Sequence, residues 1–194
     1  MMRGMPQSPR RQKQTLENAD VKCPVPYIPN ISYKGGNGFG GDRSKVREGL
    51  KHAANDLAAP AGTPVLAMAD GVVINEPYKF FFNTWAVEVK HADFIARYCE
   101  IDRNMEVKKG DSVKEGQVIA YVGNQPGPDM LHLEFFSGKK TGDLTQSSPP
   151  YNRRSDVFDG AKILDGAGIG VGRWPHSVTW RYTTDSEGRK FLDM

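Results

Sequence analysis

His52–Val73 reads HAANDLAAPAGTPVLAMADGVV, and this stretch decides the fold. Its second half opens a series of short apolar runs, separated by Gly or Asp-Gly turn signals. Many β-branched residues and no sustained helical period predict a mainly β fold built on an antiparallel sheet, as a small sandwich or half-barrel. The expected strands are TPVLAMA (63–69), GVVINE (71–76), WAVEVKH (85–91), IARYCEI (95–101), QVIAYVG (117–123) and MLHLEFF (130–136).

A second segment, VKKGDSVKEGQVIAYVGN (107–124), supports the same architecture. Two lysine-rich strand edges flank tight glycine turns, which is how the hairpin of a barrel-sandwich hybrid is built. We therefore expect three parts in the chain. Residues 1–22 form a polar, basic, disordered tail, residues 23–145 form the folded domain, and residues 146–194 form an irregular C-terminal extension that contains Trp174 and Trp180.

Composition excludes several classes of protein. The formal net charge of the 194-residue chain is +3, from mixed signs, so nucleic acid is not an expected partner. No apolar run is long enough to cross a bilayer, and the first residues lack the apolar stretch of a secretory signal. Cys23 and Cys99 are too few for a disulfide scaffold and match no zinc-knuckle spacing.

One set of residues could hold a catalytic metal ion. His52 and Asp56 lie four residues apart, and His132 lies in the middle of a predicted strand. Imidazole nitrogens and a carboxylate oxygen are ordinary Zn²⁺ ligands, and three protein ligands leave a fourth position for water, as in catalytic sites. The spacing alone is weak support, because such pairs also arise by chance.

The motifs resemble those of the lysostaphin (LytM) type of zinc endopeptidases. Residues 52–73 are similar to that family's HxGxDLAAPxGTPVxAxxDGxV opening, and residues 107–124 are similar to its VxxGDxVxxGQxIGxVGN hairpin. The resemblance runs from Gly38 to Phe136 and implies a lysostaphin-like fold with His52, Asp56 and His132 as the ligands. RYCEI, MLHLEFF and RRSDVFDG also resemble a branch of the family found among phage and bacterial-toxin sequences.

Two departures from the family pattern concern its catalytic histidines. Met130 stands in place of the first His of the HxH motif, and Glu100 stands in place of the His of YxHL. Glu100 is itself a competent general base, because other zinc peptidases place a carboxylate beside the attacking water. In a second alignment register, Glu134 rather than His132 would be the third ligand.

Three further residues are candidates for contact with the substrate: Tyr98, Arg43 and Glu134. Arg43 could meet a substrate carboxylate or could fix its loop by a salt bridge. Strand alternation predicts that Tyr98 and Glu100 share one face and that Cys99 packs on the other. We interpret His91 as a structural turn residue and His176 as an aromatic packing residue.

The resemblance implies a zinc-dependent endopeptidase that cleaves peptide bonds in bacterial peptidoglycan, as a phage lysin or a secreted antibacterial effector. Two alternatives stay open: an inactive zinc-containing module that binds cell wall or a partner, and a phage or secretion-machine assembly protein anchored by Trp174 and Trp180. We expect a protein made in the cytoplasm that acts in the periplasm or outside the cell after delivery by lysis, phage or secretion machine. An immunity or delivery protein is a further expected partner.

Overall fold

The computed structural model of the chain describes residues 21–27, 33–138, 141–167 and 179–193. The expected tail up to residue 20, Trp174 and His176 lie outside these ranges. The described elements are η1 (Gly35–Asn37), β1 (Asn55–Ala58), β2 (Pro64–Leu66), β3 (Gly71–Val73), β4 (Tyr78–Lys79), β5 (Trp85–His91), β6 (Ile95–Ile101), β7 (Ser112–Val113), β8 (Val118–Tyr121), β9 (Met130–Phe136), β10 (Val157–Phe158), α2 (Ala161–Gly166), β11 (Tyr182–Thr184) and β12 (Lys190–Leu192).

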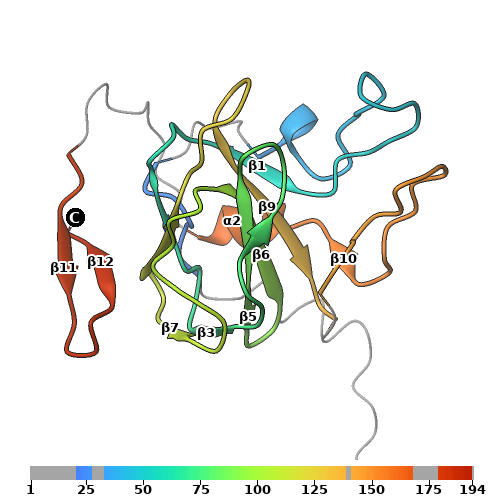
Figure 1. The fold of residues 1–194 in the computed structure, drawn as a ribbon. Coiled ribbons are helices and arrows are strands. Elements are labelled where there is room, and N and C mark those ends of the chain that lie inside the picture. The colour runs from blue at the N-terminus through green and yellow to red at the C-terminus, as the bar shows by residue number, and fades with distance from the viewer. Residues whose placement is uncertain (1–20, 28–32, 139–140, 168–178, 194) are drawn as a thin grey trace, which may run out of the picture.

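An antiparallel sheet forms the body of the molecule (Figure 1). Its strands run in the order β1-β9-β6-β5-β3-β7, with β10 added beside β9 and β4 beside β5. Strands β2 and β8 form a separate antiparallel pair, and the apolar core contains side chains from both groups of strands, including Leu57, Val65 and Ile119. The mainly β, antiparallel fold is confirmed, and each of the six predicted runs contains a strand. No helix in the described part of the chain could span a membrane.

Strand β6 carries an irregularity at Glu100. Trp85 of β5 pairs with Ile101 and the next residue, Ala86, pairs with Cys99, so Glu100 is the extra residue of a bulge. Its φ of 61° lies in the left-handed region that side chains other than glycine rarely adopt. Gly123 closes against the bulge: its N–H donates to the Glu100 carbonyl at 2.8 Å, and a Cβ there would lie 2.9 Å from the same oxygen. The bulge therefore ends the simple alternation of β6 at Glu100.

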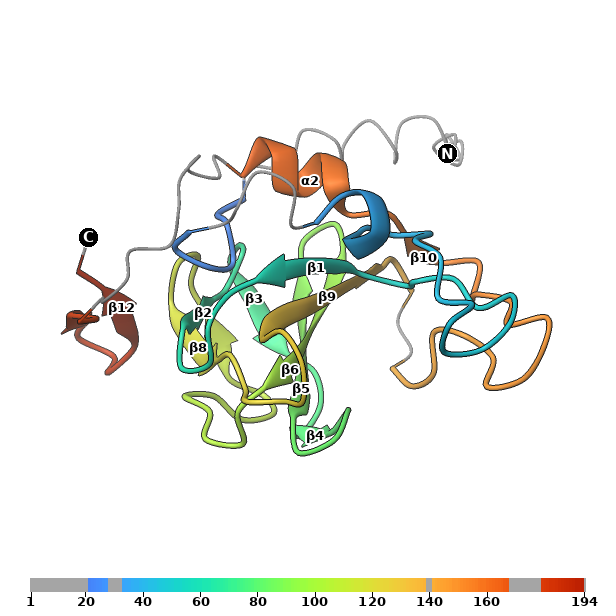
Figure 2. The ribbon, with the colours of Figure 1, turned by 90° about the horizontal axis from the view of Figure 1, so that it is seen from above.

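The segment after residue 145 is attached to the sheet in its first part. β10 continues the sheet on β9, and Ile163 and Leu164 of α2 are buried in the main core. The Asn55 side chain joins this segment to β1, because it donates to Asp159 at 3.1 Å and accepts from the Gly160 N–H at 3.0 Å. The β11–β12 hairpin lies at the opposite end of the molecule from β10 (Figures 1 and 2).

Candidate metal centre

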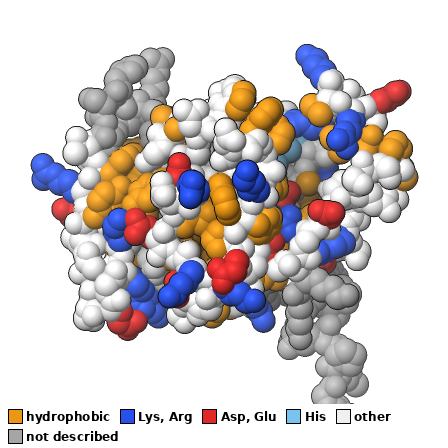
Figure 3. Space-filling view, viewed as in Figure 1, with side chains coloured by type: hydrophobic (Ala, Val, Ile, Leu, Met, Phe, Trp, Pro, Cys, Tyr) orange, Lys and Arg blue, Asp and Glu red, His pale blue; other side chains and the backbone are white. Residues whose placement is uncertain are grey.

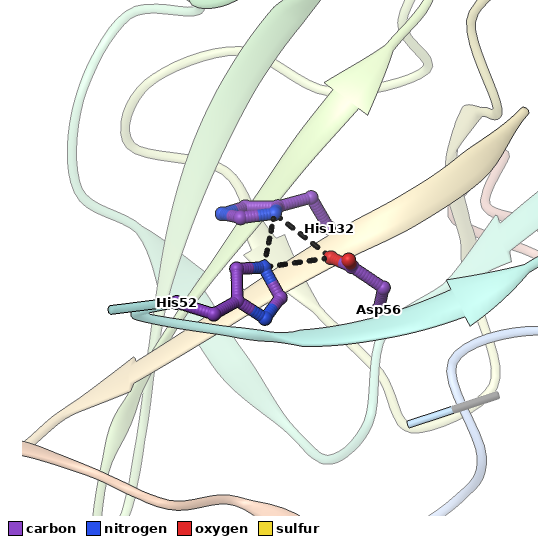
Figure 4. A group of neighbouring side chains, drawn as sticks. All are labelled: His52, Asp56 and His132. Atoms are coloured by element: carbon purple, nitrogen blue, oxygen red, sulfur yellow. Dashed lines mark hydrogen bonds and ion pairs between the residues drawn. The ribbon is translucent and has the colours of Figure 1, made fainter. Parts of the chain in front are cut away.

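Three side chains from two distant parts of the chain converge beside β1 and β9 (Figure 4). Asp56 and His132 are directly paired residues of these strands, and His52 precedes β1. The Asp56 Oδ1 atom lies 2.9 Å from His132 Nδ1 and 3.2 Å from His52 Nε2, and the two ring nitrogens are 3.3 Å apart. One ligand atom from each residue thus lies within 4.8 Å of the others, which fits the His, Asp, His donor set expected for Zn²⁺.

The outer nitrogen of each imidazole has an acceptor of its own. His52 Nδ1 lies 3.0 Å from the Gly38 carbonyl oxygen, and His132 Nε2 lies 3.4 Å from Glu134 Oε1. An N–H on the outer nitrogen leaves the inner nitrogen with its lone pair toward the centre, which is how outer partners fix the tautomer of metal-binding histidines. Gly38 and Glu134 therefore orient His52 and His132 for a cation.

Glu134 belongs to a buried ionic network. Its Oε2 accepts from Arg97 Nη1 at 2.9 Å, and Arg97 also binds Glu88 Oε1 at 2.9 Å. Burial raises the pKa of Glu134, but the hydrogen bond and charge of His132 and the charge of Arg97 outweigh burial and lower it. Glu134 thus stays ionised and can accept from His132.

The charges at the centre are strongly coupled without a metal ion. Burial on its own raises the pKa of Asp56, but its hydrogen bonds to His132 and His52 hold it well below its usual range. Burial lowers the pKa of His132, yet Asp56 and Glu134 outweigh it and raise the value to about 10. Asp56 and Glu134 thus favour the protonated form of His132, and a cation bound by the same atoms would have to displace that proton.

Arg43 lies on the outer side of Asp56, with its Nη2 atom 3.3 Å from Asp56 Oδ2. The same guanidinium donates to the Gly36 carbonyl. Of the two roles considered for Arg43, the structure shows the salt bridge that fixes its loop. The glycines of this loop also have a steric role, because a Cβ on Gly41 would lie 2.5 Å from the Gly36 oxygen.

Glu100, in the bulge, lies near enough to the metal-ligand cluster to interact with its charges. Its carboxylate interacts electrostatically with His132, Asp56 and His52, and burial is the main reason that its pKa is raised. Gln125 Nε2 donates to Glu100 Oε2 at 2.6 Å, and only 7% of Glu100 is exposed. A buried carboxylate with a raised pKa is a stronger base than an exposed one, so Glu100, held by one oxygen, is suited to accept a proton.

Several predictions about individual residues are corrected. Tyr98 is not placed to contact substrate, because it is fully buried and its hydroxyl binds the Met68 N–H and His91 Nε2. Glu134 is not placed to contact substrate either, since both of its oxygens are occupied and only 6% of it is exposed. Tyr98 and Glu100 do not share a simple strand face, because the bulge intervenes.

Other interpretations agree with the structure. In the second register Glu134 would be the ligand, but the described ligand cluster holds His132, and Glu134 lies on the far nitrogen of its ring. His91 is buried and bonded to the Asp70 carbonyl and to Tyr98, as a structural residue would be. Cys99 is fully buried, and both cysteines are free.

Sequence reasoning missed four residues around the centre: Gly38, Arg97, Gln125 and Arg153. Gly38 acts through its backbone, and Gln125 follows the predicted hairpin, so neither carries a motif of its own. Arg97 could have been found, because it lies in a predicted strand and pairs across the sheet with Glu88 and Glu134 of the neighbouring strands. Figure 3 shows a histidine at the bottom of a hollow between the body of the molecule and the loops at the right.

Residues 50–144 match the sequence profile of peptidase family M23. The chain contains a peptidase family M23 domain. Peptidoglycan DD-endopeptidase ShyC of Vibrio cholerae is 33% identical over 116 residues, which cover 55% of this chain and 26% of that protein. Peptidoglycan DD-endopeptidase ShyB of the same organism is 32% identical over 104 residues, covering 52% and 24%. The chain thus spans about a quarter of the length of these relatives.

Solved structures show the same fold. The antimicrobial peptidase lysostaphin from Staphylococcus simulans superimposes with a TM-score of 0.50 at 20% identity, covering 89% of this chain and 61% of that one. The structure of cbpa from L. salivarius REN gives a TM-score of 0.56 at 19% identity, covering 76% and 97%. The M23 fold therefore extends over the part of the chain that contains His52, Asp56, Glu100 and His132.

Proposed function

We propose that this protein is a zinc-dependent endopeptidase that cleaves peptide bonds in bacterial peptidoglycan, with Zn²⁺ held by His52, Asp56 and His132. The observation that carries the proposal is the convergence of these three ligand atoms within 4.8 Å, inside the region that matches the M23 family. The names of the V. cholerae relatives, both peptidoglycan DD-endopeptidases, support the choice of substrate.

When bound, Zn²⁺ would supply Lewis-acid activation of the scissile carbonyl and of the attacking water. The proton of that water passes to Glu100, and the same carboxylic acid then protonates the leaving amine. Gln125 holds Glu100 Oε2 at 2.6 Å, and Oε1 accepts no hydrogen bond from the residues that the structure describes. Glu100 thus has one oxygen that fixes its position and one that can take the proton.

Glu100 takes the place of the YxHL histidine, and Met130 takes the place of the first HxH histidine. Met130 begins β9 and pairs with Ala58, two residues before His132 on the same strand face. A thioether cannot serve as a general acid or base, so the proton transfers fall to Glu100 alone. Binding of peptidoglycan without cleavage would instead favour the inactive-module alternative.

The test is a digest of purified peptidoglycan by zinc-loaded wild type, Glu100→Gln and His132→Ala, with products identified by mass spectrometry. Glu115→Gln is the matched control, because Glu115 is exposed and lies in the turn between β7 and β8, outside the ligand cluster. We expect fragments from wild type and Glu115→Gln, none from Glu100→Gln with its metal content unchanged, and loss of bound zinc in His132→Ala. Absence of fragments from zinc-containing wild type would refute the proposal.

Action on peptidoglycan would place the protein in the periplasm or outside the cell. Its role as a phage lysin or secreted effector, and the immunity or delivery partner, stay predictions from the sequence. Measuring which isolated cell walls are cleaved would narrow the target.

A further inference from the structure

Loop 143–154 forms a pocket at the rim of the candidate metal centre. The cavity has a volume of about 670 Å³ and is lined by residues of this loop alone. The loop lies beside the loop that leads to His52 (Figures 1 and 2). Two arginines join them: Arg47 donates to the Ser147 carbonyl at 3.0 Å, and Arg153 donates to the His52 carbonyl. The pocket therefore adjoins a ligand residue of the centre.

Arg153, which lines this pocket, has no carboxylate partner among the described residues. Its guanidinium donates to the His52 carbonyl and lies 4.1 Å from the centre of the Phe39 ring. The neighbouring Arg154 differs, because Asp156 binds it at 2.7 and 2.8 Å. A guanidinium has five N–H donors, so Arg153 keeps donors and an uncompensated charge for another group.

Thr145 supplies a second unused polar group. Thr145 and Arg153 are directly paired in an antiparallel bridge, so their side chains lie on the same face of the loop. Thr145 also lines the pocket, and its Oγ1 is buried with no hydrogen-bond partner among the described residues. A buried hydroxyl without a partner costs stability, which a ligand oxygen would recover.

We propose that this pocket binds a carboxylate of the peptide substrate through the Arg153 guanidinium and the Thr145 hydroxyl. The inference rests on the proposed function, since it takes a peptidoglycan peptide as the ligand. Arg–carboxylate pairs are charge-assisted and often bidentate, and they give geometric specificity. Because Asp156 neutralises Arg154, the pocket offers one uncompensated arginine charge, which matches a carboxylate better than a dianionic phosphate. Asp143 in the lining is exposed, so solvent screens its charge.

The experiment measures binding by calorimetry, independently of cleavage. The probes are a synthetic stem tetrapeptide as the free acid and the same peptide with every carboxylate converted to a carboxamide. The proteins are zinc-loaded wild type, Arg153→Gln, Thr145→Val and Arg47→Gln. Arg47→Gln is the matched control, because it removes one positive charge from the same rim and loosens the same loop without a place in the pocket lining.

We expect wild type and Arg47→Gln to bind the free acid about ten-fold more tightly than the amide, and Arg153→Gln to bind both alike. Thr145→Val should reduce the preference and raise the melting temperature of the ligand-free protein. Equal binding of acid and amide by wild type, or an equal loss for both probes in Arg153→Gln, would overturn the inference. The peptidoglycan digest tests the proposed function separately, so either can fail without the other.

Discussion

Replacing Arg97 by methionine tests the buried network behind His132. Arg97 has 6% of its side chain exposed and is bound to Glu88 and Glu134, each at 2.9 Å. Removing one member of a buried ion pair leaves uncompensated charge and costs about 3–5 kcal/mol. For a chain of this size that corresponds to a melting temperature roughly 6–20 °C lower. We expect metal affinity to fall as well, by about 10–100-fold, because Glu134 would no longer orient His132 firmly.

The stability lost in Arg97→Met should depend on pH, in a direction set by the pKa of Glu134. The pKa of Glu134 is lowered in the folded protein, so its contribution to stability is present above the pKa of an unfolded glutamate and is lost on acidification. Without Arg97 that contribution shrinks. The difference in unfolding free energy between wild type and Arg97→Met should therefore be largest near neutral pH and should narrow as the pH falls below about 4.

Urea unfolding at several pH values measures the difference, and Arg103→Met is the control because Arg103 is exposed. If Arg97→Met is too unstable to purify, a triple variant removes all three buried charges together and should recover most of the stability. Its substitutions are Glu88→Gln, Arg97→Met and Glu134→Gln. A loss below about 1 kcal/mol in Arg97→Met at neutral pH, in the range of an exposed ion pair, would refute the reasoning.

Three further predictions concern the centre itself. Gln125→Leu removes the hydrogen bond to Glu100 Oε2, so we expect about a ten-fold lower kcat in muropeptide cleavage, with unchanged zinc content. An unchanged kcat would contradict the role of Gln125 in positioning Glu100. Metal binding should displace the proton from His132, whose pKa is raised to about 10. Zinc affinity should therefore rise about ten-fold per pH unit from pH 6 to pH 8. An affinity independent of pH would show that this proton is absent. Gly41→Ala places a Cβ 2.5 Å from the Gly36 oxygen, so it should displace the loop that orients His52 and Arg43 and weaken zinc binding. Gly166→Ala is the control, because a Cβ there meets nothing within 4 Å. Equal zinc affinities in the two variants would rule out the steric argument.

The sequence was sufficient to predict the strands and the convergence of His52, Asp56 and His132. Alternating apolar runs fix which residues form the sheet, and the sheet register then places Asp56 opposite His132. Glu100 stays a predicted catalytic residue, but its orientation had been assigned by strand alternation. The bulge, with a non-glycine residue at positive φ, breaks that alternation and carries no local signal in IARYCEI.

The surroundings of two substrate candidates, Tyr98 and Glu134, could not be predicted for a related reason. Tyr98 and Glu134 stand next to motif residues, and proximity in sequence does not distinguish a side chain that lines a site from one that supports it. Burial and partners from neighbouring strands decide this: the Tyr98 hydroxyl bonds to His91 of β5, and the Glu134 carboxylate bonds to Arg97 of β6. Arg153 was missed because its partner is the backbone of a residue 101 positions away.

The attachment of β10 and α2 through Asn55 has a consequence for protein engineering. Residues 50–144 carry every proposed ligand, yet transplanting that stretch alone into a chimera would uncover Phe135 and Phe136, which β10 pairs with, and would leave the Asn55 amide without Asp159 and Gly160. The smallest transferable unit therefore reaches at least Ala167, and it takes its own substrate rim, with Arg153, along with it.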